Sequence, residues 1–131
     1  MAVGRHRVTG EARARYESDT ELAARFGELL ESARAAENAL RHAQANRAAV
    51  GEQHSLGKAL DAALTDAMRA AYAAERAEIG PRGYDDWIYR RKAKAKPKVK
   101  AWTAEAERLL TLREAHRLNG IPPLAFRTPA A

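Results

Sequence analysis

The residues best suited to chemistry in this sequence form one basic segment, residues 90–100. It holds seven cations and no acid: Arg90, Arg91, Lys92, Lys94, Lys96, Lys98 and Lys100. The chain has a formal net charge of +6, from 23 Lys and Arg against 17 Asp and Glu, so without this segment acids would outnumber bases. Because the whole charge excess is local, the segment predicts a site for an anionic partner: nucleic acid, an acidic protein surface or membrane headgroups.

Lysine occupies every second position from Lys92 to Lys100. An extended chain would place all five lysines on one side, and Pro97 favours that conformation. Lysine is a flexible point charge, so this comb would contact phosphates without reading bases. In composition these nine residues resemble the lysine, alanine and proline tails of linker histones and some bacterial nucleoid proteins. The alternative is a solvated linker without a partner, and Arg5 and Arg7 are further candidate contacts near the N-terminus.

Both tryptophans of the chain, Trp87 and Trp102, flank the basic segment. Aromatic rings beside cations can stack on bases or form cation–π contacts. Large apolar side chains are more often buried, however, and this region has few of them. We therefore expect Trp87, Ile88 and Trp102 to pack the region against the rest of the fold.

Other reactive chemistry has little support in the sequence. There is no Cys, and the four histidines are isolated and match no metal-binding motif. No phosphate-binding glycine loop or nucleophile motif occurs. We expect a protein that is not an enzyme, with no metal, cofactor or small-molecule substrate. The lack of a long apolar run or secretion signal predicts a soluble protein without a membrane span, located in the cytoplasm or in a virion.

Alanine dominates the apolar composition, with 31 residues against 21 Leu, Ile, Val and Phe. Since alanine favours helices but fills little core volume, we expect an all-α fold of thin helices. The main element would be a long antiparallel helical hairpin over residues 19–80, with a turn at Gly51–Ser55 and an end at Gly80 and Pro81. Coiled-coil-like spacing gives its seam: Leu22, Phe26, Leu29 and Leu40, then Leu56, Leu60, Leu64, Met68 and Tyr72.

Three further regions flank or follow the hairpin. Residues 1–18 read as an extended basic arm in which Thr9 could cap a short helical piece. Residues 81–120 hold the basic segment and two shorter helices, one capped by Asp85 or Asp86 and one by Thr103. Residues 121–131 contain three prolines and read as an extended tail.

Together these features favour a non-enzymatic structural or assembly subunit. It would form a homo-oligomer or join a larger assembly, such as a phage structural or packaging component, through the alanine-rich hairpin. The basic segment would then contact nucleic acid or an acidic partner. One alternative is a DNA-associated regulator or nucleoid-type protein that binds DNA non-specifically. Another is an inhibitor that occupies the acidic groove of a second protein.

Overall fold

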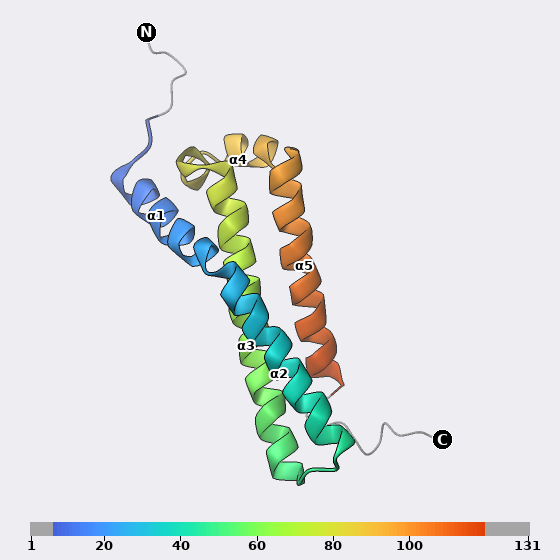
Figure 1. Ribbon diagram of the computed structural model, residues 1–131. Coiled ribbons are helices and arrows are strands. Elements are labelled where there is room, and N and C mark those ends of the chain that lie inside the picture. The colour runs from blue at the N-terminus through green and yellow to red at the C-terminus, as the bar shows by residue number, and fades with distance from the viewer. Residues whose placement is uncertain (1–6, 120–131) are drawn as a thin grey trace. The chain divides into compact units, whose positions relative to one another are not determined.

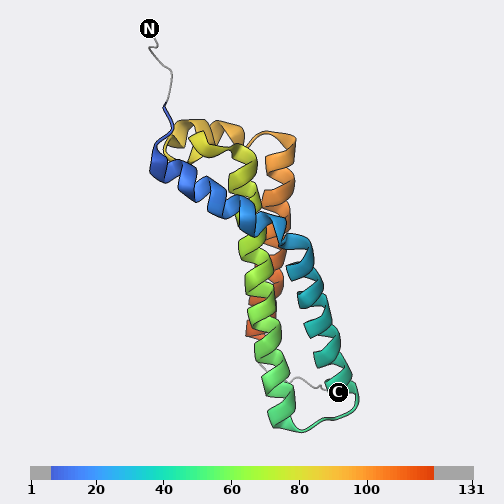
Figure 2. The same cartoon turned by 60° about the vertical axis from the view of Figure 1, so that its left-hand side comes forward.

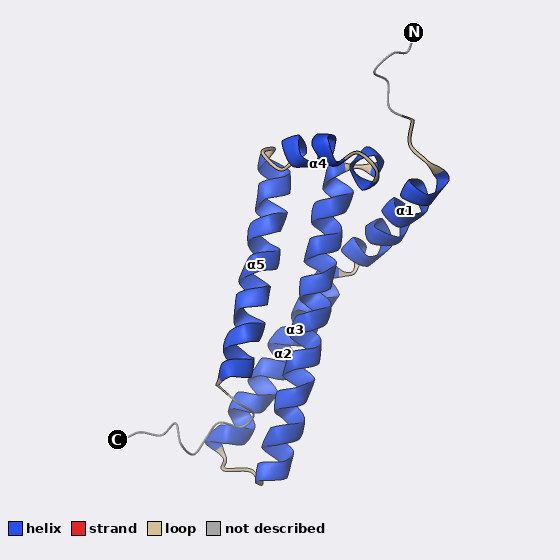
Figure 3. Cartoon of the chain, turned by 180° about the vertical axis from the view of Figure 1, so that it is seen from behind, coloured by secondary structure: helices blue, strands red, loops and turns tan. Residues whose placement is uncertain are grey.

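The computed structural model describes residues 7–119, and these form helices without any strand (Figures 1 and 3). The prediction of an all-α fold is confirmed. The described elements are five α-helices and one 3-10 helix: α1 (Gly10–Ala24), α2 (Phe26–Ala45), α3 (Val50–Ile79), η1 (Pro81–Tyr84), α4 (Trp87–Ala93) and α5 (Pro97–Leu118). Arg5 and the predicted tail at 121–131 lie outside the described residues.

Two compact units make up the chain. Among the described residues, unit 1 contains 7–26 and 69–106, and unit 2 contains 27–68 and 107–119. The boundaries fall inside α2, α3 and α5. Over these described residues, unit 1 carries 14 Lys and Arg against nine Asp and Glu, whereas unit 2 carries seven Lys and Arg against eight Asp and Glu. The charge excess of the whole chain therefore belongs to unit 1.

The predicted extended arm is wrong for residues 10–18, which belong to α1, but the prediction that Thr9 caps a helix here is confirmed. The hydroxyl of Thr9 accepts a hydrogen bond from the Ala12 backbone N–H at 3.0 Å, and Glu11 lies in the first turn. Both features stabilise a helix start. Figure 2 shows α1 lying beside the C-terminal end of α3.

The helix expected from residue 19 onward is not continuous. Helix α1 ends at Ala24, Arg25 is a turn residue, and α2 begins at Phe26. The turn expected at Gly51–Ser55 is also wrong, because both residues lie inside α3. Residues 46–49 join α2 to α3 instead.

Local capping rules explain the region after α3. Gly80 has φ 103°, a conformation that side chains with a Cβ rarely adopt, and α3 ends just before it. Asp86 then caps α4, since its Oδ1 accepts a hydrogen bond from the Tyr89 backbone N–H at 3.0 Å. Both boundaries agree with the sequence prediction.

Helix α5 starts at Pro97, seven residues earlier than a helix capped by Thr103 would. Pro97 occupies its first position, where a residue without an N–H loses no hydrogen bond. The predicted cap, Thr103, lies inside the helix instead. Its hydroxyl contacts the Val99 carbonyl oxygen at 3.0 Å and the carboxylate of Glu75 on α3, a side chain that is 6% exposed. Thr103 thus supplies a hydrogen-bond partner to the buried acid.

Alanine forms most of the buried interior. Ten of the 16 buried apolar residues among 7–119 are Ala, and only Leu109 and Val99 are large side chains with full burial. Of the predicted seam, Leu40, Leu60 and Leu64 are buried, and the rest are partly exposed: Leu22, Phe26, Leu29, Leu56, Met68 and Tyr72. Fully burying a Leu or Val contributes about 1.5–3 kcal/mol, so few residues here supply large hydrophobic terms.

Candidate anion-binding surface

The basic segment is not the extended comb predicted from the lysine spacing. It spans the end of α4, a turn at residues 94–96 and the first turn of α5. Backbone hydrogen bonds hold it throughout, including Ala95 N–H to Lys92 O at 3.2 Å, Lys96 N–H to Ala93 O at 3.0 Å and Lys100 N–H to Lys96 O at 2.9 Å. Pro97 starts a helix here because its fixed φ fits that position equally well.

Two small apolar residues anchor the segment. Ala93 is 3% exposed and Val99 is fully buried, and both pack against Ile79 at the end of α3 with Tyr89 beside them. The backbone that carries the lysines is therefore ordered before any partner arrives. Ordering a residue costs about 1–2 kcal/mol of backbone entropy, so a preformed segment avoids that cost on binding.

The five lysines of the segment all face solvent: Lys92, Lys94, Lys96, Lys98 and Lys100. Among residues 7–119, no carboxylate forms an ion pair with any of them. Most of the arginines that form ion pairs lie elsewhere, as in Arg76 with Asp19 and Arg117 with Asp61. The structure therefore concentrates uncompensated charge at one place on unit 1.

The start of α5 adds to this positive potential. Its first turn contains Lys98 and Lys100 and no acidic residue. A helix N-terminus carries a partial positive charge, and each cation near it is unfavourable by about 0.3–1 kcal/mol. Lys96, which precedes Pro97, has no acceptor atom with which to cap the helix. This end of α5 breaks the usual electrostatic rule, as functional sites often do.

Three of the arginines predicted to contact the anionic partner lie within residues 7–119, and their surroundings differ. Arg90 donates a hydrogen bond from its guanidinium to the Gly83 carbonyl oxygen at 2.6 Å. Arg91 lies over the Trp87 ring, with its guanidinium carbon 5.8 Å from the centroid. Arg7 is exposed just before α1. Arg90 and Arg91 therefore have local contacts that the lysines lack.

Burial of the aromatic flank is only partly confirmed. Trp87 is 58% exposed and Ile88 is 51% exposed, so the expectation that they pack against the fold is wrong. Helix α4 has seven residues and buries only Ala93 among them. Trp102, in contrast, is partly buried and makes an edge-to-face contact with Phe26 at 5.2 Å between ring centroids.

Sequence reasoning missed a cluster built around Asp19. This carboxylate accepts hydrogen bonds from Arg76 Nε at 2.8 Å, from a second Arg76 nitrogen at 3.2 Å and from the Tyr84 hydroxyl at 2.6 Å. Burial raises the pKa of Asp19, but the hydrogen bonds and the nearby guanidinium charges together lower it by more. The pKa of Asp19 therefore lies below its ordinary value. The partners are 57 and 65 residues away in sequence, and no local pattern links them.

Burial and the hydrogen bond to Asp19 raise the pKa of Tyr84, so its hydroxyl stays protonated and acts as a donor. The hydrogen bond to Asp19 likewise raises the pKa of Arg76, against the effect of burial. Both shifts favour one fixed arrangement of charge: a carboxylate held between a guanidinium and a phenol.

Residues 7–119 contain no group of three or more His, Cys, Asp or Glu side chains placed to hold a metal ion. Over the same residues, no helix combines the length and apolar character needed to cross a membrane. No protein-family model, curated protein or solved structure matches this chain.

Proposed function

We propose that this protein is a non-enzymatic helical subunit that binds the phosphate backbone of nucleic acid without sequence specificity. The observation that carries this proposal is the set of five solvent-facing lysines without carboxylate partners among the described residues, on a backbone that is already ordered. Phosphate contacts of this kind supply affinity and no base readout.

Two features favour a phosphate ladder over a single anion. The lysines are spread along a helix end, a turn and a helix start, so their charges cover a surface and do not converge on one point. Lysine also lacks the rigid fork with which arginine grips one carboxylate or phosphate. Such a surface matches a polymer with repeated charges.

We further propose that the hairpin formed by α2 and α3 docks with other copies or with another subunit. The support is the thin interior, in which ten of the 16 buried apolar residues of 7–119 are alanine. Apolar side chains also remain exposed on unit 2, including Val50 at 71% and Leu112 at 44%. Burying them against a neighbour would add hydrophobic stabilisation that the chain lacks.

The test of DNA binding is a charge-matched pair of triple variants. Changing Lys94, Lys96 and Lys98 to Gln removes three charges from the surface. The control changes three cations of unit 2 to Gln: Arg34, Arg41 and Lys58, all of which are exposed.

Binding to a 20-base-pair duplex would be measured by fluorescence anisotropy at about 0.1 M salt. Each phosphate contact contributes about 0.9 log units of affinity per tenfold change in salt. At about 0.1 M, tenfold below 1 M, the loss of three contacts should therefore weaken binding by about 2.7 log units, or roughly 500-fold. The control should change affinity far less. Equal losses in the two variants would show that net charge matters and this surface does not.

Light scattering of both variants separates the proposal from a DNA-binding regulator that works as a monomer. We expect an oligomer that survives the lysine substitutions, because the hairpin and the basic segment are different surfaces. A monomer at all concentrations tested would remove the assembly part of the proposal and leave the nucleoid-type alternative.

A further inference from the structure

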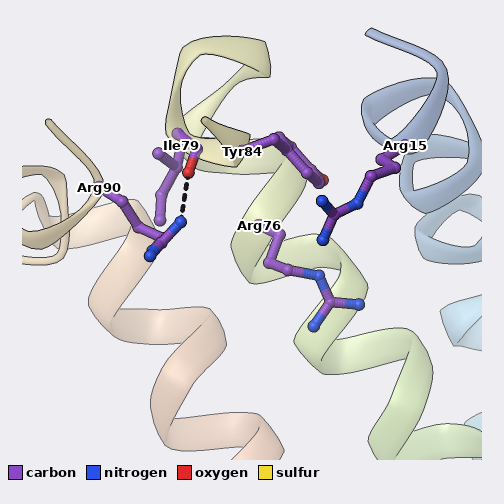
Figure 4. A pocket seen from close by; sticks show the side chains of 6 residues that line it. Arg15, Arg76, Ile79, Tyr84 and Arg90 are labelled. Carbon is purple, nitrogen blue, oxygen red and sulfur yellow. Dashed lines mark hydrogen bonds between the residues drawn. The ribbon is translucent and has the colours of Figure 1, made fainter. Parts of the chain in front are cut away.

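Unit 1 contains a pocket of about 290 Å³ with three arginines in its wall (Figure 4). Each arginine comes from a different helix: Arg15 from α1, Arg76 from α3 and Arg90 from α4. Ile79, Gly83 and Tyr84 complete the lining. We call this site the three-arginine pocket.

The charges around the pocket do not balance. Arg76 is neutralised by Asp19, whose two oxygens accept from it at 2.8 and 3.2 Å. Arg15 lies over the Tyr84 ring at 5.8 Å, and Arg90 donates to a backbone carbonyl. No carboxylate of residues 7–119 forms an ion pair with Arg15 or Arg90, although the Asp19 carboxylate also attracts Arg15 electrostatically. The wall of the pocket therefore has more positive than negative charge.

Its walls are held in place by contacts that do not involve a ligand. Tyr84 and Arg76 share the Asp19 carboxylate, and Figure 4 shows the Arg15 guanidinium and the Tyr84 hydroxyl directed toward each other. Gly83 packs so closely on Ile79 that a Cβ at Gly83 would lie 2.6 Å from Ile79 Cγ2. An anion would thus enter a pocket whose wall is already ordered.

We infer that the three-arginine pocket binds a phosphate monoester. Such a group carries a charge of about −1.5 to −2 at neutral pH, which matches the two unpaired guanidinium groups. A backbone phosphodiester carries only one negative charge, so it matches less well. Arginine presents a planar fork that binds phosphate oxygens through paired hydrogen bonds. The volume lies near the lower end of the range of about 300–1,000 Å³ typical of small-molecule sites, so it admits more than the phosphate alone.

This inference goes beyond the proposed function, since the five lysines of the proposed surface and the three arginines of the pocket are different cations. The monoester can be the terminal phosphate of a nucleic-acid strand or part of a free phosphorylated small molecule. Both sources present the same dianionic group, and the experiment below distinguishes them.

The first arm is calorimetric titration of the full chain with AMP, inorganic phosphate and adenosine. We expect AMP and phosphate to bind with saturation and adenosine to bind at least tenfold more weakly. Arg15→Gln should weaken AMP binding about tenfold or more, as expected for the loss of a charge-assisted contact. Arg34→Gln, an equal charge change at an exposed position of unit 2, should leave it unchanged.

Folding of each variant would be checked by its thermal midpoint, and Arg15→Lys gives a second reading. Lysine keeps the charge without the fork, so it should bind AMP with intermediate affinity. Binding of adenosine as tightly as AMP, or full AMP affinity in folded Arg15→Gln, would overturn the inference. An absence of saturable phosphate and AMP binding at millimolar concentrations would also overturn it.

The second arm compares 12-nucleotide single strands with and without a 5′-phosphate. Tighter binding of the phosphorylated strand, lost in Arg15→Gln, supports the pocket and assigns it to strand ends. Equal binding of the two strands together with AMP binding supports the pocket and assigns it to a free ligand. The Lys94, Lys96 and Lys98 to Gln variant should keep its AMP affinity. The AMP titration therefore tests the pocket even if the proposed DNA binding fails.

Discussion

Replacing Asp19 with Asn perturbs the contact that ties three elements of unit 1 together. The carboxylate, which is 16% exposed, accepts two hydrogen bonds from Arg76 on α3 and one from Tyr84 on η1. Asparagine has nearly the same shape but no charge. Its amide NH₂ would face a guanidinium donor, so at least one of the two Arg76 contacts is lost.

The expected loss follows from the number and setting of these bonds. A hydrogen bond to a charged group contributes about 1.5–3 kcal/mol when it is shielded from water. The Arg76 side chain is 44% exposed, so solvent screening reduces its share. We expect Asp19→Asn to lower the free energy of unfolding by about 2 kcal/mol. For a chain of this size that corresponds to a fall in Tm of roughly 5–10 °C.

The effect must also depend on pH. Because the pKa of Asp19 is lower in the folded chain than its ordinary value, its stabilisation is complete above the unfolded pKa of about 3.9. It is lost as the pH falls through the lower folded value. The difference between wild type and Asp19→Asn should therefore be constant from about pH 7 to 5 and shrink below about pH 4.

Urea unfolding followed by circular dichroism at pH 7, 5 and 3 measures both quantities. Glu37→Gln is the control, since it breaks a surface pair with Arg41 whose side chains are 46% and 72% exposed. That control should change stability by less than about 0.5 kcal/mol. The reasoning is refuted if Asp19→Asn unfolds at the wild-type urea concentration at pH 7, or if its deficit is the same at pH 3.

Three further substitutions test other parts of the structure. Thr103→Val removes the hydroxyl that contacts buried Glu75, so it should lower the free energy of unfolding in urea by about 1–3 kcal/mol. A loss below about 0.5 kcal/mol would contradict a stabilising contact. Lys98→Glu places an acid in the first turn of α5, so it should raise the free energy of unfolding by about 0.3–1 kcal/mol and weaken DNA binding measured by anisotropy. A lower free energy of unfolding would contradict the predicted interaction with the helix dipole. Gly83→Ala forces a Cβ against Ile79 and should lower the free energy of unfolding by about 1–3 kcal/mol. An unchanged thermal midpoint would contradict this prediction, because it would mean that Ile79 moves aside easily.

Local rules predicted some of the helix boundaries correctly. Gly80 ends α3 and Asp86 caps α4 as the sequence indicated, because a left-handed glycine and an N-cap carboxylate act within a few residues. The location of the excess charge was also predicted from the sequence, since the positions of the charged residues assign it to residues 90–100.

The conformation of the basic segment could not be predicted from the sequence, because Pro97 fits both an extended chain and the first turn of a helix. The choice depends on burial of Ala93 and Val99 against Ile79, a tertiary contact that the lysine spacing does not encode. The Thr9 cap was predicted correctly, but the length of α1 was not, because its contact with η1 through Asp19 and Tyr84 joins residues 65 apart in the sequence.

The three-arginine pocket could not be predicted at all from spacing. Its members Arg15, Arg76 and Arg90 lie far apart in sequence, and the chain has 17 arginines from which to choose. Only the fold of unit 1 brings these three around one cavity, and Asp19 forms an ion pair with just one of them.

The salt dependence of duplex DNA binding tests the central claim most directly. With five to seven phosphate contacts, a plot of log affinity against log salt between 50 and 300 mM should have a slope of about −4 to −6. Changing Lys94, Lys96 and Lys98 to Gln should make that slope shallower by about 2.7, at about 0.9 per contact. A wild-type slope shallower than about −2, or one that these three substitutions leave unchanged, would contradict binding of phosphates by this surface.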